Sequence, residues 1–315
     1  MRFTKLTKLT RLHKLAIPTA LLALVLGAGL AVTARSGEAV TLTHVHGLSW
    51  TSDGMRLLIP SHHGLAIYDT AGSGRWSKAD GPAHDYMGFS ATRAALYSSG
   101  HPAAGSNQRN PFGLIKSIDG GRTWSQLGLE GESDFHLLAT SYGANAVYVV
   151  NHAANSRMKE AGLYHTESDG LKWTRAAASG LRGDIKSLAV HPSDPRIVAV
   201  GTADGLYLSL NAGDSFERIV AGAQVLGIAF DLDGAHLWLS SHSGKAALAR
   251  LALVTGAKPQ AREIPAFSED AVAYIAQNPA RRGEIAIASF KRDVYLSKDE
   301  GRTWKSIARE GASHE

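Results

Sequence analysis

Short apolar stretches alternate with polar, glycine-rich turns along most of the chain. Six of these stretches are rich in small residues, and each is followed by a second apolar stretch, such as Arg196–Val200 or Glu284–Ser289. Stretches of this length bounded by turn residues predict β-strands. Because small residues let backbones converge on an axis, we expect these six to be the innermost strands of a ring. Their expected ranges are 44–50, 86–92, 135–141, 185–191, 225–231 and 272–278.

A turn motif, Ser-x-Asp-x-Gly-x-Thr-Trp, occurs in full at Ser117–Trp124 and Ser297–Trp304. Its Ser and Asp side chains can bond turn amides, and its Gly permits positive φ. Looser copies lie at Thr166–Trp173 and Ser209–Phe216, and a worn copy ends at Trp76. The closing aromatic residues are 48, 49, 43 and 88 residues apart, and the last gap holds two units of 44. An all-β, six-bladed β-propeller is therefore predicted, with seven blades as the alternative.

The first 34 residues differ from the rest. Residues 1–14 carry five basic and no acidic residues, and residues 15–34 are an apolar run. This order predicts a signal peptide, and the run is about long enough to span a bilayer, so an uncleaved anchor is the alternative. We expect residues 40–315 to form a single propeller domain exported to the periplasm or beyond the cell. Membrane contact would be through residues 15–34 alone, as an inner-membrane anchor, if they stay uncleaved.

Charge and cysteine content narrow the choice of partners. The net charge is +5, and residues 1–34 account for all of it, which leaves 28 basic and 28 acidic residues in the remainder. The basic isoelectric point thus reflects the targeting segment, and we expect no nucleic-acid partner. The absence of cysteine fits an exported protein that avoids unwanted disulfides.

Histidine and aspartate gather at the starts of the first three expected inner strands. Strand side chains two residues apart point to the same side, so His44 and His46 should face one way. Aligning the six strands on their apolar anchors gives two columns, each expected to form a ring around the axis. One column reads His44, Asp85, Asp134, Asp184, Gln224 and Ala271, and the next reads His46, Met87, His136, Lys186, Leu226 and Ala273.

The turns that join the second and third strands of each blade should lie on the same face as these strand starts. Nine of the fourteen histidines map to this face: His44, His46, His62, His63, His84, His101, His136, His152 and His242. Two long loops, residues 100–112 and 152–161, also belong to it, and loops on a rigid scaffold often carry binding residues. The cluster predicts either a ligand site or a polar lining for a water-filled channel.

The repeated turn motif resembles that of the BNR/Asp-box repeat superfamily, which includes sialidases, xyloglucan-cleaving propellers, the sortilin ectodomain and a photosystem assembly factor. The chain is also similar to exported bacterial Asp-box proteins that are often labelled glycosyl hydrolases. This resemblance implies an architecture more than a function.

Three functions fit these observations. The first is metal binding by His44, His46, Met87, His101 and His136, since imidazole suits copper, zinc and nickel, and thioether favours Cu(I). Copper or zinc is the expected ion.

The second function is glycoside hydrolysis, which needs two carboxylates across the channel. The candidate catalytic residues are Asp85, Asp134 and Asp184. A sialidase would also need an arginine cluster and a Tyr/Glu pair, and the strand starts carry neither, since Tyr86 has no Glu partner. The third function is a protein-interaction or assembly propeller, so the expected partner on this face is a protein or a carbohydrate.

Overall fold

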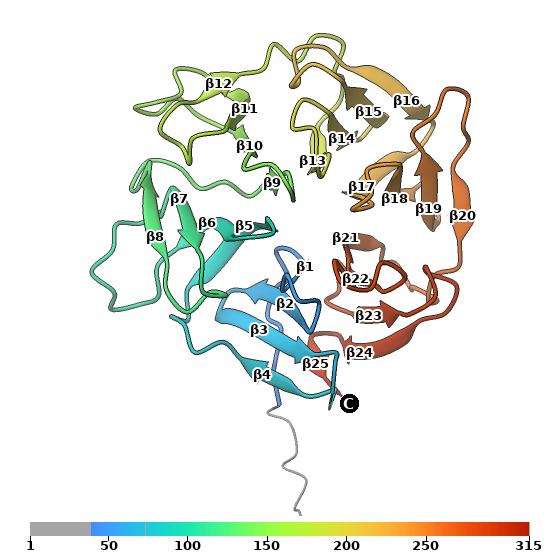
Figure 1. The fold of residues 1–315 in the computed structure, drawn as a ribbon, viewed down its shortest axis with the longest axis horizontal. Helices are drawn as coiled ribbons and strands as arrows, with labels where there is room; N and C mark the ends of the chain where they lie inside the picture. Colours follow the sequence, from blue (N-terminus) through green and yellow to red (C-terminus); the bar gives the residue numbers. More distant parts are fainter. Residues whose placement is uncertain (1–38, 73, 315) are drawn as a thin grey trace, which may run out of the picture. The chain divides into compact units, whose positions relative to one another are not determined.

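The computed structural model describes residues 39–72 and 74–314, which form a six-bladed β-propeller (Figure 1). The predicted fold class and blade number are therefore confirmed. The described residues are all β, and no helix among them is long and apolar enough to cross a membrane. The predicted signal peptide or anchor, residues 1–34, lies outside the described residues.

Each blade is an antiparallel sheet whose strands follow one another in chain order from the axis outward. The first three blades are β1 (Ser49–Trp50), β2 (Arg56–Ser61), β3 (Gly64–Asp69), β4 (Trp76–Lys78); β5 (Asp85–Ala91), β6 (Leu96–His101), β7 (Leu114–Ser117), β8 (Ser125–Gly128); and β9 (Leu138–Thr140), β10 (Val147–Asn151), β11 (Gly162–Thr166), β12 (Thr174–Arg175).

The other three blades follow the same order, and the last has a fifth strand. They are β13 (Ile185–Val190), β14 (Val198–Thr202), β15 (Gly205–Ser209), β16 (Glu217–Ala221); β17 (Gln224–Phe230), β18 (His236–His242), β19 (Ala246–Ala252), β20 (Gln260–Arg262); and β21 (Val272–Gln277), β22 (Ile285–Ser289), β23 (Val294–Ser297), β24 (Lys305–Arg309), β25 (Ala312–Ser313).

Antiparallel order fixes two faces of the propeller. We call the face where innermost strands begin the upper face; it includes the β2–β3 turn at His62 and the start of β5 at Asp85. The lower face carries the turns between third and fourth strands. Four innermost strands lie close to the predicted ranges, but β1 and β9 begin later than predicted, at Ser49 and Leu138. Residues 44–48, which precede β1, make one backbone hydrogen bond to β2, from the His46 amide to the Pro60 carbonyl.

The hydrophobic core lies between neighbouring blades, and the alternation of strand side chains explains this. In β2, Leu57 and Ile59 pack with Ala286 of the sixth blade, whereas Leu58 packs with Phe89 of the second. Successive strand residues point to opposite faces of a sheet, so each central strand contributes to two interfaces. All four of these β2 and β22 side chains are fully buried, and they hold the blades in a rigid ring.

The repeated turn motifs lie on the lower face and are held by their own side chains. The Ser117 hydroxyl accepts a bond from the Gly121 amide at 2.8 Å, and Asp119 accepts bonds from the Thr123 amide and hydroxyl at 3.0 and 2.6 Å. The Ser297–Trp304 copy repeats these bonds. The first bond also recurs in the looser copies, from Gly170 to Thr166 and from Gly213 to Ser209.

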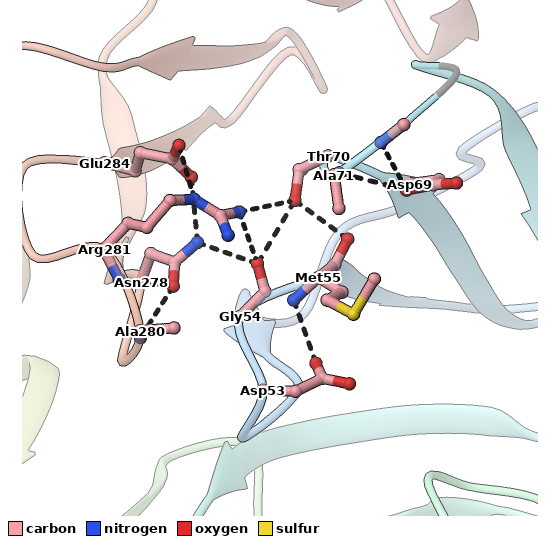
Figure 2. A network of polar contacts seen from close by, with 11 residues as sticks. Asp53, Gly54, Met55, Asp69, Thr70, Ala71, Asn278, Ala280, Arg281 and Glu284 are labelled. Atoms are coloured by element: carbon pink, nitrogen blue, oxygen red, sulfur yellow. Dashed lines mark hydrogen bonds and ion pairs between the residues drawn. The ribbon is translucent and has the colours of Figure 1, made fainter. Parts of the chain in front are cut away.

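The ring closes between the first and sixth blades. The segment Val40–Leu42 pairs with Gly311–Ser313, which includes β25. Figure 2 shows a second link between the β1–β2 and β21–β22 turns. There the Gly54 carbonyl accepts bonds from Asn278 Nδ2 at 2.9 Å and from Arg281 Nη2 at 2.7 Å.

Candidate metal centre

Three histidines meet at the upper face of the first blade. His44 and His46 precede β1, and His62 lies in the β2–β3 turn. Their ring centroids are 4.7 to 5.1 Å apart. One nitrogen from each lies within 4.8 Å of the others, close enough to share one metal ion. We call these residues the three-histidine cluster.

A carboxylate orients one ring of this cluster. Asp85 begins β5 in the second blade, and its Oδ2 lies 3.0 Å from Nδ1 of His62. Because a carboxylate accepts, the Nδ1 atom carries the proton, and the Nε2 lone pair is left to bind an ion. The other carboxylate oxygen, Oδ1, is buried and has no hydrogen-bond partner within the described residues.

His46 is the most enclosed member of the cluster. Its Nε2 atom is buried and has no hydrogen-bond partner within the described residues. Burial, together with the nearby imidazoles of His44, His62 and His136, lowers the pKa of His46 from 6.5 to about 4. The ring is therefore neutral at pH 7, which is the form that coordinates a metal.

The other predicted histidines form a separate group at the boundary of the second and third blades. Asp134 Oδ2 lies 3.2 Å from His101 Nε2 and 3.4 Å from His136 Nδ1. The Nδ1 atom of His101 also lies 2.6 Å from the Asn110 side-chain oxygen. These residues are not among the described groups compact enough to hold a single ion. His136 is still near the three-histidine cluster, since its imidazole is one of the groups that lower the pKa of His46.

The two remaining predicted residues, Met87 and Asp184, differ in their burial. Met87 is buried within β5, and its carbonyl accepts a bond from the Ser98 hydroxyl at 3.2 Å. Asp184 is 88% exposed, and its carboxylate lies 3.8 Å from Lys186 Nζ. Sequence reasoning put His62 on the correct face but left it out of the site. The signal that could have added it is the Ser61–Gly64 turn, which places His62 beside the start of the next blade.

A second group of suitable residues lies on the fifth blade, at Asp231, Asp233 and His236. Asp231 is 1% exposed and already accepts bonds from Trp238 Nε1 at 2.7 Å and from the Arg250 guanidinium. The Arg250 guanidinium supplies the positive charge that a metal ion would otherwise supply to Asp231. We therefore interpret this group as a structural ion pair.

The innermost strands enclose a cavity of about 230 Å³ on the propeller axis. All six blades contribute to its wall, and His46, His136 and Lys186 line it on the upper side. Among the described residues that line it there is no aspartate or glutamate. The three candidate catalytic carboxylates, Asp85, Asp134 and Asp184, therefore lie outside this wall.

Four of the innermost strands pair irregularly with their neighbours just above their apolar anchors. The register shifts between Tyr86 and Phe89, and similar shifts occur in β13, β17 and β21 at the corresponding position. A β-bulge turns the side chains above it relative to those below. Of the predicted column that begins with His46, every member except Met87 lines the axial cavity, whereas no member of the column that begins with His44 is in its described lining.

Comparison with protein-family models gave no match for this chain, and neither did a search of the curated proteins. Among solved structures, it is similar to the GH74 enzyme of Niastella koreensis, with a TM-score of 0.59 and 16% identity over 88% of this chain and 46% of that one. It is also similar to the extracellular domain of the putative one component system BT4673 from B. thetaiotaomicron, with a TM-score of 0.53 and 16% identity over 87% and 35%.

A third similar structure is the β-propeller domain of Cps50 (Swd1) from Myceliophteria thermophila, with a TM-score of 0.53 and 10% identity over 88% of this chain and 90% of that one. The chain spans less than half the length of the first two proteins. The structural likeness establishes the propeller fold. Because the sequence identities are so low, the function has to be argued from the site.

Proposed function

We propose that this protein binds a transition metal ion through His44, His46 and His62 at the upper face of the propeller. The observation that carries the proposal is the three-histidine cluster itself, with three ring nitrogens within 4.8 Å of one another. Three nitrogens bound to one zinc ion at 2.0–2.1 Å would lie about 3.4 Å apart in tetrahedral geometry. Metal binding would therefore draw the three nitrogens closer together than they lie in this structure.

The ligand set indicates the class of ion. Imidazole suits zinc, copper and nickel, and no cysteine is present to add a softer ligand. Asp85 fixes the tautomer of His62 in the way that carboxylates support metal-bound histidine in other proteins. Three protein ligands leave a fourth position open. We therefore favour Zn²⁺ or Cu²⁺, because the three ligands that lie close together are all imidazoles.

Glycoside hydrolysis has less support. It requires two carboxyl groups that flank a bound sugar. Asp85 and Asp134 are each engaged by histidine, and Asp184 is exposed beside Lys186. The likeness to a GH74 enzyme extends to the fold at 16% identity. Hydrolysis of glycosides by the purified protein, lost in Asp85→Asn or Asp134→Asn, would favour this alternative.

We further propose that the chain is a member of the Asp-box type of propeller and acts outside the cytoplasm. The shared bonding of the four lower-face turns supports the first proposal. The basic and apolar residues 1–34 support the second. Cell fractionation with antibodies to residues 40–315 tests it, and a cytoplasmic location would contradict it.

The metal proposal is tested by calorimetric titration of the chelator-treated full chain with Zn²⁺, Cu²⁺ and Cu⁺. We expect one equivalent to bind with a dissociation constant below about 1 μM, which is about 8 kcal/mol of binding free energy. His62→Ala should weaken binding about a hundredfold or more, as expected for the loss of a ligand. His63→Ala is the matched control, since the neighbouring ring lies outside the cluster and is exposed. Absence of binding, or equal effects of the two substitutions, would contradict the proposal.

A further inference from the structure

The axial cavity has two chemically distinct zones. On the upper side it is lined by His46, His136 and Lys186. Below them comes a ring made by the apolar anchor of every innermost strand, each of which lines the cavity. The ring consists of Leu48, Phe89, Leu138, Leu188, Ile228 and Ile275.

The upper zone favours a negative charge. Lys186 is the one lysine or arginine of the described lining, and no carboxylate lines the wall to neutralise it. Its nearest acidic partner is Asp184, whose carboxylate lies 3.8 Å from Nζ and is 88% exposed to water. An exposed pair at this distance gains little, so the ammonium is available to a ligand. Asp134, the other nearby carboxylate, is turned toward His101 and His136.

The lower zone favours an apolar body. Five of the six anchors are 6–8% exposed, so one edge of each side chain reaches the cavity while the rest is buried. Trp50 and Phe230 extend this apolar wall, and polar side chains such as Ser90, Thr140 and Gln277 also line the cavity. Transfer of a hydrocarbon group from water to this wall would contribute about 0.8 kcal/mol of favourable binding free energy for each methylene. At about 230 Å³, the cavity is somewhat smaller than pockets for drug-sized ligands.

From this arrangement we propose that the axial cavity binds a small organic anion, a monocarboxylate with an apolar body. Lys186 pairs with the carboxylate, and His136 is close enough to the upper side to donate a further hydrogen bond. The apolar body enters the ring of anchors. The proposal rests on the cavity wall and does not require the metal, so it is tested on the chelator-treated protein.

The first test uses probes that separate charge from apolar area. Octanoate, octan-1-ol, octylammonium and acetate are titrated into the full chain at about pH 7.5 in the presence of EDTA, with calorimetry as the readout. Octanoate should bind with one-to-one stoichiometry. Each of the other three probes should bind at least about tenfold more weakly than octanoate, because each lacks either the negative charge or the apolar tail. Equal binding of octanoate and octan-1-ol would overturn the charge assignment, and equal binding of octanoate and acetate would overturn the apolar one.

Substitution of the lysine provides the second test. Lys186→Met removes the charge while keeping an unbranched side chain of nearly the same length. It should weaken octanoate binding about tenfold or more and leave octan-1-ol binding unchanged. Lys186→Arg should restore most of the octanoate affinity. Lys245→Met is the matched control, because Lys245 is exposed and lies outside the cavity wall. No octanoate binding at all, or an equal loss with Lys245→Met, would overturn the proposal, even if the three-histidine cluster is found to bind metal.

Discussion

The Nδ1 atom of His62 lies 3.0 Å from the Oδ2 atom of Asp85, across the boundary between the first and second blades. The bond links the β2–β3 turn to the start of β5 and leaves the Nε2 lone pair of His62 unprotonated. Two blades thus contribute to one cluster, because a carboxylate on the second blade sets the tautomer of a histidine on the first.

Asp85→Asn should weaken metal binding by about ten- to a hundredfold, the usual cost of losing a carboxylate that orients a histidine ligand. The asparagine keeps the size of the side chain, so the fold should be unchanged. Competition titration against a chelator of known affinity measures the effect. Asp184→Asn is the control, because Asp184 is exposed and contacts Lys186 instead of a histidine. A loss of affinity in the control equal to that in Asp85→Asn would contradict the assigned role.

The metal-free protein should lose stability in mild acid through His46. In the unfolded chain this ring takes up a proton near its ordinary pKa of 6.5, whereas burial and the neighbouring histidines hold the folded pKa at about 4. Between these values the unfolded state binds more protons, so the free energy of unfolding falls as pH drops from 6.5 toward 4 and then levels off. Urea unfolding at several pH values measures this slope.

His46→Gln serves as the comparison for that slope. Burial also lowers the pKa of His84 and His165, and both contribute a similar fall in the parent and in the variant. The difference between the two curves therefore isolates His46, and the variant should be less sensitive to acid. Curves that run parallel would mean that the ring is not enclosed as described.

Gly54→Ala should disrupt ring closure. The residue has a φ of +70°, and a Cβ atom there would lie 2.1 Å from Asn278 Oδ1. Gly120 has a similar φ of +76° with nothing near its missing Cβ, so Gly120→Ala measures the backbone strain alone. We expect about 1–2 kcal/mol for the control and about 1–3 kcal/mol more for Gly54→Ala. Equal losses in denaturant unfolding would show that the turn has room to move.

Ser117→Ala should destabilise the lower-face turn of the second blade. The hydroxyl is buried and accepts the Gly121 amide, so its removal leaves a buried donor unpaired. Such a group costs about 1–3 kcal/mol. Ser125→Ala, at an exposed position one residue beyond the motif, should change the unfolding free energy by less than about 0.5 kcal/mol. Comparable losses at both positions would contradict the role of the motif.

The repeat spacing was sufficient to predict the fold, because each turn motif and each small-residue strand recurs once per blade. His44 and His46 do lie close together, with ring centroids 5.1 Å apart, although they precede the strand from which their proximity was predicted. Two features could not be predicted in this way. The register shift after Tyr86 depends on how the blades converge at the axis, and the approach of His62 to Asp85 depends on contacts between blades.

The closing aromatic residues of the turn motifs show which features the motif specifies and which it does not. Trp124 folds back on its turn, with Nε1 donating to the Gly121 carbonyl at 3.2 Å, and its ring lies 5.0 Å from that of Tyr86. Trp124 and Trp304 are both half-buried. The motif specifies local bonds, whereas burial depends on how far each lower-face turn projects beyond its neighbour.

The most direct test of the central claim is X-ray absorption spectroscopy of the protein loaded with one equivalent of Zn²⁺. The account predicts histidine nitrogens at about 2.0–2.1 Å, with the multiple scattering of three imidazole rings and one light-atom ligand in the fourth position. His62→Ala should reduce the imidazole contribution by one ring, and His63→Ala should leave it unchanged. A zinc shell made of water and carboxylate oxygens, or a spectrum unaffected by His62→Ala, would contradict a metal site at His44, His46 and His62.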